Sequence, residues 1–298
     1  TANYIVVSSL MAPVIITLGA KSGLIVPLIA VHLFVFYFGI LADDTPPVGL
    51  AAFAAAAISG GDPIKTGLQG FAYDIRTALL PFLFIFNTEL LLINVGVVKA
   101  FFVFGVAVVA MMLFASATQG FMFVKNRKWE SAALLLVAFT LFRPGYWLDI
   151  VSPPYNIHNP DVVYEVVDEV TPNGTLLFVV SGPDFDSGKI ESTTILVNLG
   201  DQADAVERLR KAGLTVTVES GRAVIEEPFP GTPYFESLGK SFDYYGDDPV
   251  QIAEVRQPAD RAAKEWFYIP AILLLAIIMM MQKRRQRDNE EPGVATAA

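Results

Sequence analysis

The segment at residues 42–49, Ala-Asp-Asp-Thr-Pro-Pro-Val-Gly, holds the residues whose types and spacing best suit ion binding. Apolar sequence flanks two acids, a threonine and a proline pair, which are Asp43, Asp44, Thr45, Pro46 and Pro47. Prolines lack the backbone N–H and disfavour helix in the residue before them, so the chain should unwind here. Unpaired backbone at membrane depth must face protein or a water-filled site, and ionisable residues at that depth are costly.

Membrane transporters use unwound helices of this kind to bind ions, because freed carbonyls coordinate cations and half-helix N-termini hold anions. We predict that the Thr45 hydroxyl and carbonyl bind sodium and that the Val48 and Gly49 amides face a substrate carboxylate. The alternative is an ordinary loop in which Asp44 or Thr45 caps the next helix. Residues 48–58 form too short an apolar run to cross a bilayer alone, which favours one broken, crossing helix.

Thr1 and Asn3 open the first apolar run. Polar residues at a helix start are usually caps. The functional alternative is the tip of a re-entrant hairpin, where their side chains would coordinate a cation. Because the chain enters apolar sequence almost at once from Thr1, we expect it to be part of a larger membrane protein.

The composition indicates a membrane protein that carries a soluble module. Of 298 residues, 53% are hydrophobic and only 17% are charged, against about 25% charged in soluble proteins. Residues 151–265 hold 20 acidic and 9 basic residues, a net charge of 9 − 20 = −11, which leaves +2 of the total −9 for the rest. The acidic block argues against nucleic-acid binding. With no cysteine, two histidines and no nucleophile–base pair, we expect no enzyme activity.

Apolar runs predict the membrane-spanning elements, since a spanning helix needs about 20 apolar residues. The expected spans are residues 4–20, 24–58 with the break, 100–118, 131–148 and 266–282. An amphipathic helix at 64–76 should lie at the interface and continue into the bilayer at 78–86. The fold class is therefore a mainly α-helical membrane protein with a small α/β domain.

Residues 151–265 predict that α/β domain. Strands are expected at 176–180 and 194–198, a helix at 201–212 ending at Gly213, and a hairpin within 214–225. The basic clusters at 125–128 and 283–287 should be cytoplasmic. Residues 151–265 are then extracytoplasmic, and the polar tail after residue 287 should be disordered.

Four stretches carry a resemblance to a known family. They are Thr-Ala-Asn-Tyr-Ile-Val-Val at 1–7, the stretch 31–51, Ser-Gly-Gly-Asp-Pro at 59–63 with Lys65-Thr66-Gly67, and residues 258–268. These stretches are similar to the fused permease subunits of TRAP transporters, which have an extra C-terminal module and usually work with TAXI-type binding proteins. The chain resembles the C-terminal portion of such a large membrane subunit.

The resemblance implies an elevator-type transporter of the bacterial inner membrane that takes up small organic anions, dicarboxylates or amino acids. It implies sodium as the coupling ion and no other cofactor. The implied partners are a periplasmic TAXI-type substrate-binding protein, the upstream remainder of the permease and the lipid bilayer. Carried over by position, the sodium site is Thr1, Asn3 and Thr45. The wider ion and substrate site adds Asp43, Asp44, Pro46, Pro47, Val48 and Gly49.

These expectations divide the chain into four parts. Residues 1–95 would be the C-terminal part of the transport domain, with a hairpin arm, the broken helix and the following helix. Residues 96–150 would be two additional transmembrane helices, 151–265 the periplasmic module, and 266–298 a last transmembrane helix with a cytoplasmic tail. The alternative function is a membrane-anchored module that binds a partner without transport. A pure anchor does not need a double-proline break flanked by acids.

Overall fold

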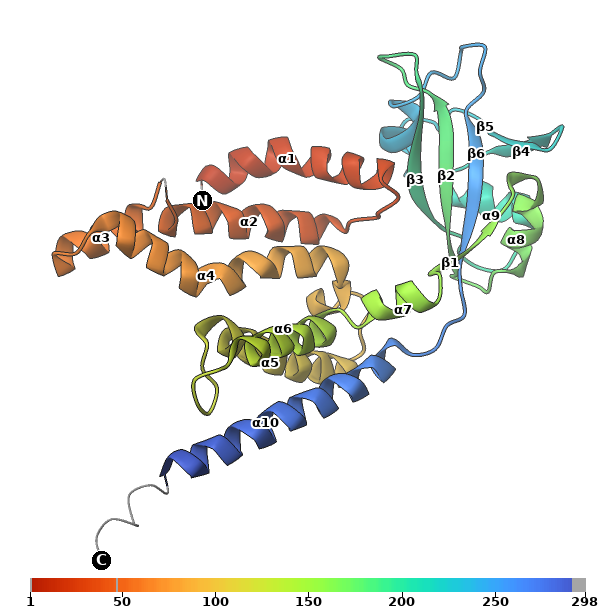
Figure 1. Ribbon diagram of the computed structural model, residues 1–298. Coiled ribbons are helices and arrows are strands. Elements are labelled where there is room, and N and C mark those ends of the chain that lie inside the picture. Colours follow the sequence, from red (N-terminus) through yellow and green to blue (C-terminus); the bar gives the residue numbers. More distant parts are fainter. Residues whose placement is uncertain (1, 47, 291–298) are drawn as a thin grey trace, which may run out of the picture. The chain divides into compact units, whose positions relative to one another are not determined.

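The computed structural model describes residues 2–46 and 48–290 (Figure 1). The chain divides into two compact units. The helical unit comprises Thr1–Ser9, Pro27–Ser152 and Ala262–Ala298, within the described residues, and the sheet unit comprises Leu10–Val26 and Pro153–Arg261. The protein is mostly helical with one small antiparallel sheet.

The helical unit is built from apolar helices. After α1 (Ala2–Lys21), which is divided between the units at Ser9, they are α2 (Leu28–Asp44), α3 (Leu50–Ser59), α4 (Pro63–Phe86), α5 (Val97–Gln119), α6 (Lys128–Phe142), α7 (Gly145–Val151) and α10 (Tyr268–Glu290), with short 3₁₀ turns η1 (Thr88–Leu91) and η4 (Lys264–Phe267). Among the described residues, three helices are long and apolar enough to cross a bilayer: Tyr4–Lys21, Val97–Gln119 and Lys264–Asn289. The protein is therefore membrane-integral.

Helix α4 is one continuous helix over the predicted segments 64–76 and 78–86. Asp62 caps its start, since its carboxylate accepts the Lys65 backbone N–H at 2.8 Å, and Pro63 occupies the first helical position. With 24 residues, α4 is about 36 Å long.

The span predicted at residues 131–148 is a sharply bent pair of helices, which together are long and apolar enough to cross a bilayer. Helix α6 ends at Phe142 and α7 begins at Gly145, with an angle of 84° between them. Pro144 is the cause, because it lacks a backbone N–H and disfavours helix at Arg143. At the C-terminus, α10 continues through the basic cluster to Glu290, so residues 288–290 are helical and not part of a disordered tail.

The sheet unit contains six antiparallel strands in the order β3-β2-β6-β5-β4, with β1 also paired to β6. Its elements are β1 (Tyr155–His158), η2 (Pro160–Val162), α8 (Val163–Glu169), β2 (Thr175–Pro183), β3 (Ile190–Asn198), α9 (Ala205–Ala212), β4 (Val216–Glu219), β5 (Arg222–Ile225), η3 (Phe235–Gly239) and β6 (Gln251–Pro258). Its core packs the helices against the sheet: Val163 and Val167 of α8 and Leu209 of α9 are buried with Phe178 and Val180 of β2.

The predicted strands and hairpin are confirmed, although β2 and β3 are longer than expected. The predicted helix at 201–212 begins later, at Ala205, because the Asp204 carboxylate accepts the Val206 N–H at 3.2 Å and caps it there. Gly213 ends α9 in the left-handed conformation, with φ of 97°, as predicted.

Candidate functional site

The candidate site is the break between α2 and α3. Helix α2 ends at Asp44 and α3 starts at Leu50. The carbonyls of Ala42 and Asp43 would normally accept N–H groups four residues later, but those positions are the prolines 46 and 47, which have none. The last turn of α2 therefore carries two carbonyl oxygens that the helix ladder does not use.

Thr45 sits at the centre of this break. Its hydroxyl donates to the Leu41 carbonyl at 2.8 Å, and its backbone N–H donates to the same oxygen at 3.1 Å. Because the hydroxyl proton points to the Leu41 carbonyl, the lone pairs of Thr45 Oγ1 face away from that carbonyl. Lone pairs directed this way are able to coordinate a cation. The Thr45 carbonyl accepts the Gly49 N–H at 2.8 Å. That carbonyl keeps a second lone pair, whereas the Gly49 amide is already used within the break.

Gly49 has a backbone conformation that suits glycine. Its φ of 48° and ψ of 36° are left-handed, and it directly precedes α3. Its carbonyl accepts the Phe53 N–H at 2.9 Å, the first bond of the new helix. Beside it, Val48 is 50% exposed.

Helix α4 packs along both halves of the broken helix (Figure 1). Near its start, a β-carbon on Gly67 would lie 3.1 Å from Pro46 Cγ and 3.4 Å from Ala52 Cβ, so α4 approaches the break closely. Near its end, the Phe82 ring lies 5.2 Å from the Phe34 ring. The two contacts show that α4 runs antiparallel to α2 and α3 taken together. In a hairpin closed at the prolines, α2 and α3 would run in opposite directions, so α4 could be antiparallel to only one of them. Helices α2 and α3 are therefore two halves of one interrupted helix.

The remaining predicted site residues are only partly placed. The Asp43 side chain is exposed in the last turn of α2. Thr1 and Pro47, and the side chains of Asn3 and Asp44, lie outside the described residues.

The start of α1 is placed by Tyr4, the neighbour of Asn3. Its hydroxyl lies 3.0 Å from His32 Nδ1, and its ring packs against Phe36 of α2. Phe36 precedes Asp43 by seven residues, or about 10 Å along the helix. The contacts of the described residues thus place the start of α1 beside the middle of α2, not at the break itself.

Comparison with protein families matches both parts of the chain. Residues 1–100 match the DctM component of the tripartite ATP-independent periplasmic (TRAP) transporters, and residues 100–288 match a domain of unknown function, DUF3394. The chain therefore joins part of a TRAP permease to a DUF3394 domain. No curated protein and no solved structure shows significant similarity to it. The DctM match supports a role as a transporter component, and that family implies a periplasmic substrate-binding protein as partner.

The DUF3394 part of this TRAP permease begins within α5 and includes the whole sheet. At one end of its helices, Glu89 bridges two cations, with carboxylate oxygens 2.7 Å from Lys99 Nζ and 2.7 Å from Lys264 Nζ. Burial alone would raise the pKa of Glu89, but the hydrogen bonds from Lys264 and Lys99 hold this pKa below its ordinary value. The ionised Glu89 therefore ties the starts of α5 and α10 to the end of α4.

At the opposite helix ends of the permease, a second bridge surrounds Glu130, which is 1% exposed. Its carboxylate accepts hydrogen bonds from Arg285 Nη1 and Nη2, at 3.0 and 2.9 Å, and from Gln282 Nε2 at 3.1 Å. The Arg127 backbone N–H also donates to it, at 2.8 Å. Sequence analysis missed this cluster; the only local signal was a glutamate three residues after Arg127, typical of a capping box.

Sequence analysis also missed Arg208, a fully buried arginine of α9. Its guanidinium donates to backbone carbonyls of Val167, Val170, Thr171 and Leu199, at 2.5, 2.8, 3.1 and 3.3 Å. The available signal was its position next to Leu209, on the apolar side of an amphipathic helix. Among the described residues, no group of three or more His, Asp or Glu is arranged to hold a metal.

Proposed function

We propose that this TRAP permease couples sodium entry to the uptake of small organic anions, dicarboxylates or amino acids, and that the break between α2 and α3 binds both. A TAXI-type periplasmic protein would deliver the substrate, and an elevator-type movement would carry it across the bacterial inner membrane. The observation that carries the proposal is the proline pair, which frees carbonyl oxygens in the middle of an apolar helix that α4 supports on both sides of the break.

The two helix ends at the break have opposite partial charges. The C-terminus of α2 is negative and the N-terminus of α3 is positive, each by about half an elementary charge. Sodium is therefore assigned to the α2 end, at Thr45 with the carbonyls of Ala42 and Asp43. Thr1 and Asn3 are not included, because their neighbour Tyr4 contacts the middle of α2. The substrate carboxylate is assigned to the first turn of α3. Asp43 and Asp44 add negative charge on the sodium side.

Replacement of Thr45 by valine tests the sodium site. Valine keeps the shape and removes the hydroxyl oxygen, so we expect the sodium concentration for half-maximal uptake to rise roughly tenfold, equivalent to ~1.4 kcal/mol of lost binding. The measurement is uptake of radiolabelled substrate into proteoliposomes that contain the permease and its binding protein, across a series of sodium gradients.

Ser59→Ala is the matched control, since the Ser59 hydroxyl also bonds a carbonyl of the preceding helical turn but lies at the far end of α3. This variant should keep the wild-type sodium dependence. An unchanged sodium dependence in well-expressed Thr45→Val would remove Thr45 from the proposed site.

We also propose that residues 151–265 are periplasmic and that the C-terminus is cytoplasmic, with residues 1–95, 96–150 and 266–298 divided as the sequence predicts. Two clusters support this orientation. Arg285 at the end of α10 donates to the Lys125 carbonyl at 3.1 Å, so the two basic clusters lie at the same end of the helical unit. Lys264, just before the start of α10, pairs with Glu89, so the chain that follows residue 261 enters the helical unit at the end opposite the basic clusters.

Cysteine labelling tests the orientation. A cysteine at the exposed Ser187 should react with a membrane-impermeant maleimide in intact spheroplasts, whereas one at exposed Asp288 should react only after permeabilisation. Val180→Cys, at a position with no exposed surface, controls for unfolded protein and should stay unlabelled. Labelling of Asp288→Cys but not of Ser187→Cys in intact cells would reverse the orientation.

A further inference from the structure

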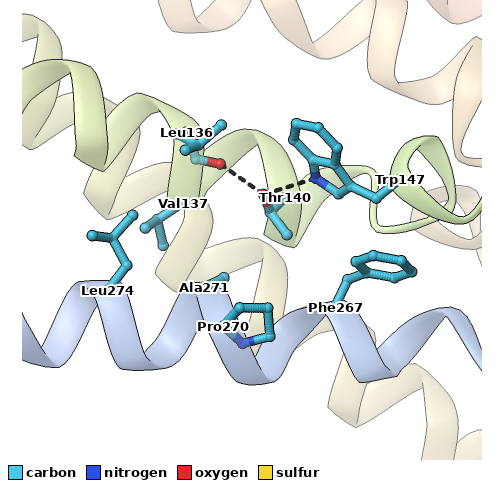
Figure 2. A pocket seen from close by; sticks show the side chains of 8 residues that line it. All are labelled: Leu136, Val137, Thr140, Trp147, Phe267, Pro270, Ala271 and Leu274. Carbon is cyan, nitrogen blue, oxygen red and sulfur yellow. Dashed lines mark hydrogen bonds between the residues drawn. The ribbon is translucent and has the colours of Figure 1, made fainter. Parts of the chain in front are cut away.

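A cavity of about 240 Å³ lies between α6, α7 and α10, entirely within the helical unit. It is lined by Leu136, Val137, Thr140, Trp147, Phe267, Pro270, Ala271 and Leu274. Figure 2 shows the α6 side chains on one side, those of α10 facing them, and the Trp147 indole at one end. The 84° bend at Pro144 produces this hollow, because it turns α7 away from the path that a straight α6 would follow.

The wall of the cavity is apolar. The hydrogen-bond donors of its two polar side chains are both used. Trp147 Nε1 donates to Thr140 Oγ1 at 3.0 Å, and the Thr140 hydroxyl donates to the Leu136 carbonyl at 2.8 Å. Apolar cavities of about 150 Å³ stay dry and accept small hydrocarbons. A polar solute would find no partner here, so the occupant must be a hydrocarbon.

The surroundings identify the source of that hydrocarbon. Helix α10 and the bent pair α6–α7 are both apolar enough to span a bilayer, so a partly open hollow between them is filled from the bilayer. Tyr146 and Trp147 of α7 are aromatic residues of the kind found at the headgroup level. Arg143 lies at the same bend, with its guanidinium 4.3 Å from the Phe86 ring centre and 5.5 Å from that of Tyr146. A cation at this level attracts a lipid phosphate.

We propose that this cavity is a phospholipid site, in which one acyl chain lies between α6 and α10 and the phosphate lies beside Arg143. The chain completes the packing of α10 against α6, because a void there would forfeit the dispersion contacts of its lining atoms. The site is in the DUF3394 part and does not depend on the proposed transport function.

Photocrosslinking tests the site in the full chain, reconstituted in vesicles of phosphatidylethanolamine and phosphatidylglycerol with a diazirine on one acyl chain. Illumination followed by proteolysis and mass spectrometry should find the label concentrated on peptides that contain residues 136–147 and 267–274. In Ala271→Phe, where the new ring fills the hollow, labelling of these peptides should fall about tenfold, equivalent to ~1.4 kcal/mol of lost binding. Leu136→Phe should act in the same way from the opposite wall.

Ile272→Phe is the matched control, since Ile272 is the next residue and is 56% exposed, away from the cavity. Its labelling should equal that of the wild type. Equal labelling in Ala271→Phe, Leu136→Phe and Ile272→Phe, or labelling spread evenly over α5 and α10, would mean general bilayer contact only and would overturn the proposal.

Discussion

Replacing both prolines of the break, Pro46→Ala with Pro47→Ala, should abolish sodium-driven uptake while the permease still folds into the membrane. Each alanine restores an N–H group, and these donors would occupy the carbonyls of Ala42 and Asp43. Alanine also favours helix over proline by about 3 kcal/mol per residue. Helices α2 and α3 should therefore join into one continuous helix, and the oxygens assigned to sodium would be lost.

We expect uptake to fall roughly hundredfold, equivalent to about 2.7 kcal/mol, measured in the same proteoliposomes as for Thr45→Val. Pro13→Ala is the control, because Pro13 also lies inside an apolar helix but belongs to the sheet unit and is not part of the break. That variant should transport like the wild type. Normal uptake by the double variant, at wild-type abundance, would show that unwound backbone at this position is not required for transport.

Replacing Arg208 with leucine should produce the largest loss of stability in the sheet unit. Leucine keeps an apolar side chain against the core but removes every donor to the four carbonyls of Val167, Val170, Thr171 and Leu199. Three of these carbonyls come from the end of α8 and the residues directly after it, where the helix dipole is negative and a cation is favourable. We expect a cost of about 3–5 kcal/mol in the free energy of unfolding, since four backbone carbonyls would lose their hydrogen bonds from the buried guanidinium.

Thermal unfolding of the full chain in detergent, followed by near-ultraviolet circular dichroism and by protease cleavage within residues 153–261, measures this loss. Arg210→Leu is the matched control, since Arg210 is exposed on the same helix. Arg208→Lys should fall between wild type and Arg208→Leu, because one ammonium cannot reproduce the planar fork of the guanidinium. Similar melting temperatures for Arg208→Leu and Arg210→Leu would contradict this structural role.

The helix break shows what could be predicted without coordinates. Proline acts on its own N–H and on the residue before it, so the end of α2 at Asp44 follows from local sequence. The same rule applies to Pro144, yet the apolar run at 131–148 was predicted as one span with no break at this proline. Hydropathy counts apolar residues and does not register the direction of the chain, so the bend and the cavity beside it were missed.

The sequence by itself determined which stretches are apolar, where prolines interrupt them, and that an acidic module separates two membrane segments, because these properties belong to neighbouring residues. Only the tertiary structure decided that α4 runs beside both halves of the broken helix, that Glu130 meets Arg285, and that Arg208 reaches the end of α8. Those contacts join residues far apart in the chain, and they exist because buried charges and carbonyls need partners wherever packing places them. No local sequence pattern specifies which distant residue becomes the partner of a buried charge, so only the folded structure determines these contacts.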